Sequence, residues 1–181
     1  MPELDGMNID EIAKKFNLTP EETVAKVLID CEGGTLAIYY SLNEDDVLNI
    51  MKDMNISVGS DGCDFSYDLE FNPHPRSFGT FPRFLQTVRE NKLMSLEDAI
   101  YKMTALPACI IYLTDRGTLK TGNIADITVF DYDEIEDLAT FTNPLVKPKG
   151  IYHVFVAGIP SILNGLQTDN RAGRVLLKPN K

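Results

Sequence analysis

The sequence predicts an α/β protein in two parts: helices with isolated strands to about residue 115, and a smaller β part after it. Three patterns support this. Apolar residues recur at helical spacing in the first two thirds, short β-branched runs interrupt the helices, and glycine-bounded strand patterns follow Leu113. A chain of 181 residues with 44% hydrophobic content can build one domain or two small ones around a core.

Two helices are predicted near the N-terminus, over about 9–16 and 20–31. Each starts with a polar acceptor that is followed three residues later by glutamate, which is the capping-box pattern: Asn8 with Glu11, and Thr19 with Glu22. Gly33 and Gly34 are expected to end the second helix. The apolar stripes expected on the two helices are Ile9, Ile12, Ala13 and Phe16, and Val24, Val27, Leu28 and Cys31.

Strands and helices are then expected in alternation. The strand-like runs of the middle region are 36–40 and 56–60, and the helices are 43–54, 81–90 and 96–104. Beyond Leu113 the sequence predicts a strand around Ile127 and Val129, two strands on either side of Gly158, and a last strand in "GRVLLK". The stretch 131–150 is expected to be mostly loop.

Composition and charge exclude several classes of partner. The net charge of −10 argues against nucleic acid, because phosphate binding needs clustered lysines and arginines. The three cysteines form no C-x-x-C pair and are odd in number, which is typical of a reducing compartment. No basic, apolar leader and no apolar run of about 18 residues is visible, so neither a signal peptide nor a membrane span is expected. The cytoplasm is the predicted location.

Asp61 is the first candidate functional residue. It follows the apolar run 56–60, and an acid at the carboxyl end of a buried strand is where α/β barrels place catalytic groups. Ser-Asp-Gly is equally ordinary turn chemistry, and this second interpretation stays open.

Two further candidates follow Asp61 in an acidic loop. Arg76 is suited to binding a substrate carboxylate with its planar fork, and a salt bridge to one of the loop acids is the alternative. His74 lies between two prolines and cannot form a metal site alone, since zinc needs three or four ligands. His153 lies in a β run and is expected to be a satisfied sheet residue.

The order of several short motifs carries a resemblance. "GSDG" (59–62), "HPR" (74–76) and "GTFPR" (79–83) precede "DRGTLKTGNIADITVFD", and "ATFTNP" and "GIYHVFVAG" follow. In this order they resemble the C-terminal portion of the N-acyl-D-amino-acid deacylases (D-aminoacylases), a family of the amidohydrolase superfamily. The resemblance extends over nearly the whole chain.

The resemblance implies a fold and a set of roles. Residues 1–115 would be the C-terminal part of a TIM-like (β/α)8 amidohydrolase barrel, with its last strand and flanking helices, and residues 116–181 would be a small β-sandwich-type domain. Asp61 would contact the metal and act as catalytic base and then acid, between the metal-bound water and the leaving amine. Arg76, with His74 beside it, would bind the carboxylate of the substrate.

The chain departs from the family in its metal ligands. No H-x-H pair is present, neither His74 nor His153 matches a family ligand, and a complete barrel needs about 250 residues. The resemblance therefore implies zinc in the full-length parent enzyme and no cofactor for this chain alone. The expected function is that of a C-terminal fragment of a zinc-dependent amidohydrolase acting on N-acyl-D-amino acids, inactive without the remainder.

Two alternatives follow from the same residues. A missing N-terminal half is the partner expected for the enzyme fragment. A non-catalytic paralogue would instead act by self-association or partner binding, through the apolar faces of the 9–16 and 24–31 helices that a complete barrel would cover. A metal-free hydrolase built on Asp61, His74 and Arg76 would lack an evident nucleophile and oxyanion hole.

Overall fold

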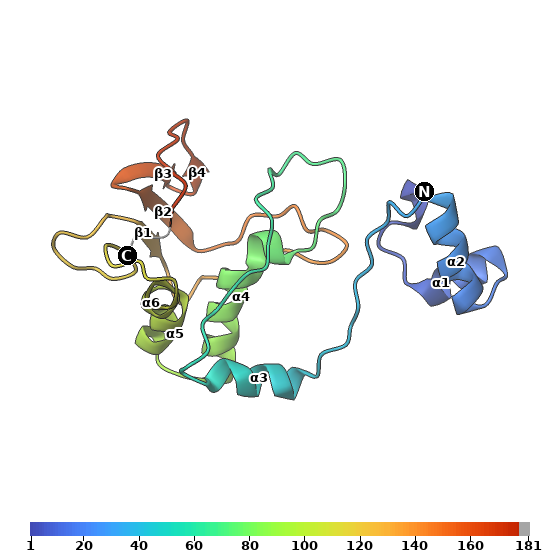
Figure 1. Ribbon diagram of the computed structural model, residues 1–181, viewed down its shortest axis with the longest axis horizontal. Coiled ribbons are helices and arrows are strands. Elements are labelled where there is room, and N and C mark those ends of the chain that lie inside the picture. The colour runs from blue at the N-terminus through green and yellow to red at the C-terminus, as the bar shows by residue number, and fades with distance from the viewer. Residues whose placement is uncertain (178–181) are drawn as a thin grey trace.

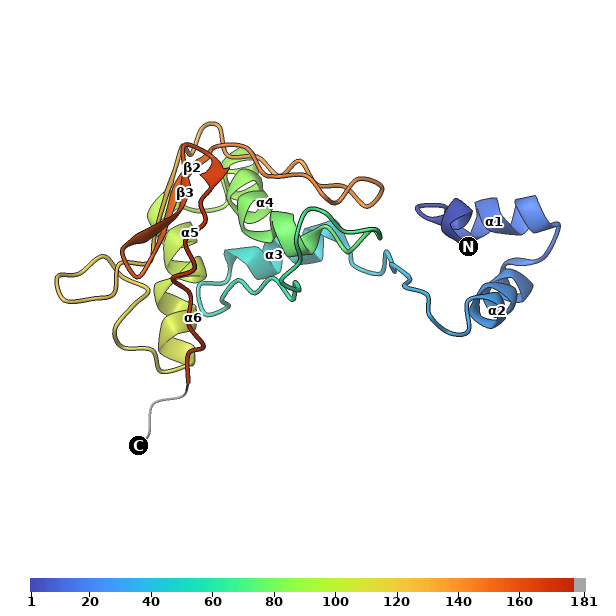
Figure 2. The same cartoon turned by 90° about the horizontal axis from the view of Figure 1, so that it is seen from above.

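The computed structural model describes residues 1–177, and Figure 1 shows that they form a smaller and a larger body. The smaller body contains a 3-10 helix (Pro2–Leu4), α1 (Ile9–Phe16) and α2 (Pro20–Asp30). Figures 1 and 2 show it at one end of the molecule, beyond the connecting segment. It approaches the larger body at Gly6, where a side-chain carbon would lie 3.4 Å from Thr142 Cγ2. Residues 34–43, which have no regular secondary structure, connect the two bodies.

The two N-terminal helices begin as the sequence predicts. The Asn8 side chain accepts a hydrogen bond from Glu11 N at 2.9 Å, and Thr19 accepts one from Glu22 N at 3.3 Å. In both cases the glutamate side chain accepts a bond from the capping residue, so both capping boxes are confirmed. Gly33 ends α2 with φ +74°, a left-handed conformation that glycine adopts without strain.

The larger body is built around four further helices. They are α3 (Glu44–Lys52), α4 (Arg76–Asn91), α5 (Leu96–Met103) and α6 (Ala105–Ile110). Helix α4 starts before the predicted position 81 and keeps Pro82 inside it, and Thr104, with φ −130°, separates α5 from α6. Within residues 1–177, none of the helices combines the length and apolarity needed to cross a membrane.

A four-stranded antiparallel sheet completes this body, with the strands in the order β1-β2-β3-β4. The strands are β1 (Ile127–Phe130), β2 (Ile151–Val156), β3 (Ile159–Leu163) and β4 (Leu166–Gln167). The strand around Ile127 and Val129 and the pair about Gly158 are thereby confirmed. Of the predicted strand "GRVLLK", residues 173–177 form no strand and Lys178 lies outside the described residues.

The core of the larger body lies between α4, α5 and the segment that follows β1. Its buried members are Phe84, Leu85, Val88, Ala99 and Ile135. Phe130 of β1 and Ile151 of β2 pack against this cluster, so the sheet is joined to the helices through its first two strands. Full burial of a Val, Leu, Ile or Phe side chain contributes about 1.5–3 kcal/mol, so this cluster stabilises the larger body.

Two predicted strands are wrong. Residues 36–40 and 56–60 have strand-like sequences, yet neither pairs with another strand in the part of the chain that the structure describes. A strand needs a neighbour to satisfy its backbone N–H and C=O groups. Over 56–60, Ile56 donates its N–H to the nearby Asp53 carbonyl at 3.2 Å and Val58 donates to the Lys102 carbonyl at 3.0 Å, and neither acceptor lies in a strand.

Candidate active site

Asp61 lies in a turn between α3 and α4 and has a left-handed backbone, with φ +48°. Aspartate tolerates this conformation better than most residues. The turn is closed locally, since the Ser60 hydroxyl accepts a hydrogen bond from Gly62 N at 3.2 Å. The backbone of Ser60, Asp61 and Gly62 is therefore turned, as the second interpretation has it. The Asp61 carboxylate remains exposed and can contact other groups.

The turn is docked on the first turn of α4. A side-chain carbon at Gly62 would lie 2.8 Å from the Cα of Ser77, which real structures do not tolerate, so only glycine permits this approach. One residue later, Cys63 donates its backbone N–H to the Ser77 hydroxyl at 3.2 Å. The contact brings Asp61 beside the helix start that carries Arg76.

Arg76 and Asp61 form an ion pair, with Arg76 Nη2 2.9 Å from Asp61 Oδ2. The Arg76 side chain is 44% exposed and that of Asp61 is 85% exposed. Arg76 thus forms the salt bridge to a loop acid that was the alternative to substrate binding. This acid is Asp61, the candidate catalytic residue. Both groups remain accessible to a small molecule.

His74 completes the group of predicted residues. Its Nδ1 accepts a hydrogen bond from Arg76 N at 3.1 Å, which orients the ring at the start of α4. Burial lowers the pKa of His74, the Arg76 charge lowers this pKa further, and the Asp61 carboxylate opposes both effects. With a pKa below its ordinary 6.5, the imidazole is neutral at pH 7 and Nδ1 is free to accept.

An aromatic group borders these residues. The rings of Phe141 and His74 meet edge-on with 5.2 Å between their centroids, and the rings of Tyr40 and Phe141 also meet edge-on at 5.2 Å. Phe141 lies in "ATFTNP" and Tyr40 in the connecting segment, so this group joins three distant parts of the sequence. The residues 61–72 add a second aromatic contact, in which Tyr67 stacks on Phe78 of α4 at 4.6 Å.

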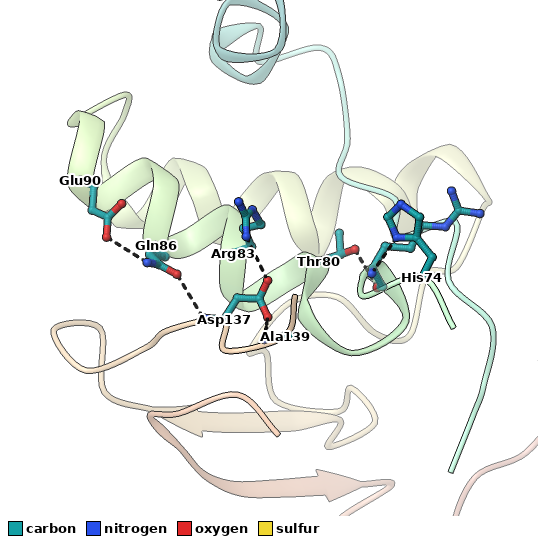
Figure 3. A network of polar contacts seen from close by, with 8 residues as sticks. His74, Thr80, Arg83, Gln86, Glu90, Asp137 and Ala139 are labelled. Atoms are coloured by element: carbon teal, nitrogen blue, oxygen red, sulfur yellow. Dashed lines mark hydrogen bonds and ion pairs between the residues drawn. The ribbon is translucent and has the colours of Figure 1, made fainter. Parts of the chain in front are cut away.

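Figure 3 shows what holds the Phe141 segment in place. Asp137 donates its backbone N–H to the Gln86 side chain at 3.1 Å, and its carboxylate lies 3.5 Å from Arg83 Nη1. A side-chain carbon at Gly79 would lie 2.1 Å from that carboxylate, so α4 accommodates the close contact only because the position is glycine. The segment after Asp137 is thereby fixed along α4.

Sequence reasoning missed several of these contributors. Ser77, Asp137, Phe141 and Tyr40 were assigned no role. Asp137 sits in the acid-rich run "DEIEDL", which is typical of a solvated loop, and no local pattern indicates that its side chain is buried. The absence of a side chain at Gly62 and Gly79 was the available signal, since glycine is typical of close backbone approach. His153 behaves as expected for a sheet residue, because its Nδ1 accepts Asn164 N at 3.2 Å.

The residues present do not by themselves fit a zinc ion. Among residues 1–177, no three histidine, cysteine, aspartate or glutamate side chains gather closely enough to hold a metal. A zinc site takes three or four protein ligands. Two pockets of about 330 and 360 Å³ lie near α6 and residues 113–118, and none of the three candidate residues lines them.

Comparison with known proteins agrees with the sequence-based resemblance. D-aminoacylase from Alcaligenes xylosoxydans xylosoxydans is 38% identical over 183 aligned positions, which cover 98% of this chain and 35% of that protein. A solved structure of D-aminoacylase, studied for its binuclear metal centre, matches with a TM-score of 0.82 and 35% identity over 97% of this chain and 35% of that one. The N-acyl-D-glutamate deacylase of Bordetella bronchiseptica, solved with zinc and a phosphonate inhibitor, matches with a TM-score of 0.77 and 36% identity over 88% and 32%.

The chain spans about a third of the length of the relatives it matches. The sequence profile of the amidohydrolase family matches residues 50–161, which include the Asp61 turn, all of α4 and the first two strands of the sheet. This match covers more than half of the chain, and the predicted kinship with the deacylases is confirmed. The chain belongs to the amidohydrolase family.

Proposed function

We propose that this chain is part of an enzyme that hydrolyses the amide bond of N-acyl-D-amino acids. Residues 1–115 would belong to a TIM-like barrel, and residues 116–181 to a small β domain of the β-sandwich type. The single observation that carries the proposal is the Asp61–Arg76 pair, which lies in the segment that matches the amidohydrolase profile. The names of the relatives supply the substrate class, N-acyl-D-amino acids.

Asp61 is assigned the proton-transfer role. Its carboxylate is largely exposed at the tip of a fixed turn, so it can approach the amide of a bound substrate. A positioned carboxylate that accepts and then donates a proton contributes about 10²–10⁴-fold to such reactions. The protonated leaving amine departs more readily, and Oδ1 or Oδ2 of Asp61 is the atom that carries this proton.

Arg76 and His74 are assigned to substrate recognition. A guanidinium provides paired N–H donors that match a carboxylate, and every N-acyl-D-amino acid carries one. The neutral His74 ring keeps the Arg76 backbone in place through its Nδ1 contact. The aromatic group of Tyr40, Phe141 and His74 borders the same place and offers an apolar surface to the rest of the substrate.

Zinc would require ligands from outside the residues described here. The relatives include an enzyme solved with zinc, whereas residues 1–177 contain no cluster of three ligands. Within residues 1–177, Asp61 is the candidate that we assign to such a site. We therefore expect the chain alone to bind no stoichiometric zinc and to be inactive.

Complementation tests this proposal. The chain is mixed, in the presence of zinc, with the part of D-aminoacylase that it does not cover, and amine release from N-acetyl-D-leucine and its L enantiomer is measured. The account predicts hydrolysis of the D enantiomer by the mixture and none by either part alone. A mixture that forms a stable, zinc-containing complex and hydrolyses neither enantiomer would show that the proposed function is wrong.

A second candidate function is association with itself. The segment 36–42 exposes Leu36, Tyr39, Tyr40 and Leu42 to at least 80%, and Val24 and Leu28 of α2 are also exposed. Contiguous apolar surface of this kind is typical of a protein contact site.

A further inference from the structure

The ion pair of Asp61 and Arg76 joins the two residues that the proposed reaction would use separately. The contact runs from Arg76 Nη2 to Asp61 Oδ2, at 2.9 Å. Nη2 belongs to both two-donor edges of a guanidinium, so Asp61 sits beside either edge that a substrate carboxylate could use. A second carboxylate at the same cation is also repelled by the charge of the first.

The protein keeps Asp61 at this place through its backbone. Gly62 packs against the Ser77 backbone, and Cys63 donates its N–H to the Ser77 hydroxyl. Because Ser77 directly follows Arg76, the docked turn places one carboxylate within reach of the guanidinium. Asp61 therefore acts on Arg76 as an intramolecular ligand.

We propose that Asp61 occupies the carboxylate-binding place on Arg76, and that the carboxylate of an N-acyl-D-amino acid binds by displacing it. This inference rests on the proposed function and adds an order of events to it. Displacement frees the Asp61 carboxylate at the moment when a substrate is anchored next to it. Substrate recognition by Arg76 and the availability of the proton-transfer group are then coupled.

The size of the competition follows from the exposure of the pair. Solvent-exposed ion pairs are weak, and their loss corresponds to about a two- to fivefold change in an equilibrium constant. Removing the Asp61 charge should therefore strengthen carboxylate binding by about two- to fivefold. Asparagine is the suitable replacement, since it also tolerates the left-handed backbone at position 61.

The test measures the affinity of the 181-residue chain for N-acetyl-D-leucine by NMR titration. Asp61→Asn is expected to bind about two- to fivefold more tightly than the unchanged chain, and Arg76→Gln is expected to lose binding. Asp64→Asn is the matched control, because Asp64 is exposed, lies in the same loop and forms none of the ion pairs found in residues 1–177. N-acetyl-D-leucinamide lacks the carboxylate that Arg76 would bind, so it should bind neither the unchanged chain nor Asp61→Asn.

The outcomes separate this inference from the proposed function. If Arg76→Gln loses binding while Asp61→Asn gains none, displacement is overturned and the anchoring role of Arg76 stands. An equal gain in Asp64→Asn would overturn displacement as well, because the effect would then be one of overall charge. Unchanged binding by Arg76→Gln would contradict the anchoring role, and displacement with it. Absence of measurable binding by Asp61→Asn would also overturn the inference.

Discussion

At the scale of single residues, the candidate site depends on two glycines that allow close contacts. Gly62 lets the Asp61 turn approach the Ser77 backbone, and Gly79 lets the buried Asp137 carboxylate lie against α4. Neither contact leaves a direct mark in the sequence apart from the glycine itself. The position of Asp61 thus depends on glycines that take no part in binding or catalysis.

Gly62→Ala is predicted to disturb this geometry. The added carbon would overlap the Ser77 Cα, and overpacking of this kind costs about 1–3 kcal/mol. The free energy of unfolding, measured by urea denaturation, should fall by that amount, and the amide signals of Cys63 and Ser77 should shift.

Gly59→Ala is the matched control in the same motif. Nothing lies within 4 Å of a side-chain carbon at Gly59, so its effect should stay within about 0.5 kcal/mol. Equal effects of the two substitutions would contradict a specific docking of the turn on α4.

Several individual residues could be predicted from the sequence, and others could not. The capping pairs of α1 and α2 follow from local spacing, because a cap and its partner are only three residues apart. The partner of Arg76 could not be chosen, since the loop offers four acids and the selection depends on how the turn docks on α4. Asp137 is 51 residues from Gln86, and no local pattern reports such a contact.

At the scale of elements, α4 organises the site and the core together. Its first turn carries Arg76 and Ser77, and its buried face provides Phe84, Leu85 and Val88. The sequence predicts this helix but places its start at about 81, five residues after Arg76, where the helix begins. The structure keeps Pro82 buried inside α4, so the tertiary contacts outweigh the missing backbone donor.

Helix α5 holds the segment that leads to Asp61. Lys102 is only 1% exposed, its Nζ donates to the Asp53 carbonyl at the end of α3, and its own carbonyl accepts Val58 N. Burial lowers the pKa of Lys102 from its ordinary 10.5, and the nearby Asp53 carboxylate partly opposes this. The Lys102 side chain therefore links α5 to the end of α3, and the Lys102 carbonyl contacts the predicted strand 56–60.

This burial has a consequence for stability as a function of pH. Because the folded protein binds the Lys102 proton less tightly than the unfolded chain does, the unfolded state carries more protons between the two pKa values. The contribution of Lys102 to the free energy of unfolding should therefore increase as pH rises toward 10.5. Urea denaturation at pH 7 and pH 9.5 measures it.

Lys102→Met should remove this pH-dependent gain, whereas Lys120→Met, at an exposed lysine, should retain it. The same pH dependence in all three proteins would rule out a lowered pKa of Lys102 in the folded protein.

At the scale of the whole molecule, the chain consists of a small helical body and a larger body that contains the site. The sequence predicts the change from helices to strands after residue 115, and the sheet over 127–167 agrees with it. It could not predict that 36–40 and 56–60 pair with no strand among residues 1–177, because a strand pattern describes a surface and does not say what covers it. The side chains of Leu36 and Tyr39 in the first of these segments, and of Leu42 just after it, are each 83% exposed.

Exposed apolar surface on this scale predicts concentration-dependent self-association. Light scattering on the 181-residue chain should give a mass above that of a monomer, and Leu36→Ser with Leu42→Ser should restore the monomer. Leu119→Ser removes an equally exposed leucine from another part of the chain and should leave the mass unchanged. A monodisperse monomer at high concentration would show that this surface drives no association.

The most direct test of the central claim is the effect of Asp61→Asn on deacylation by the complemented enzyme. The wild-type chain, mixed with the part of D-aminoacylase that this chain does not match, should release amine from N-acetyl-D-leucine. Asp61→Asn should lower this rate by about 10²–10⁴-fold, while Asp64→Asn, in the same loop, should leave it nearly unchanged. An Asp61→Asn mixture that hydrolyses as fast as the wild type would contradict the account.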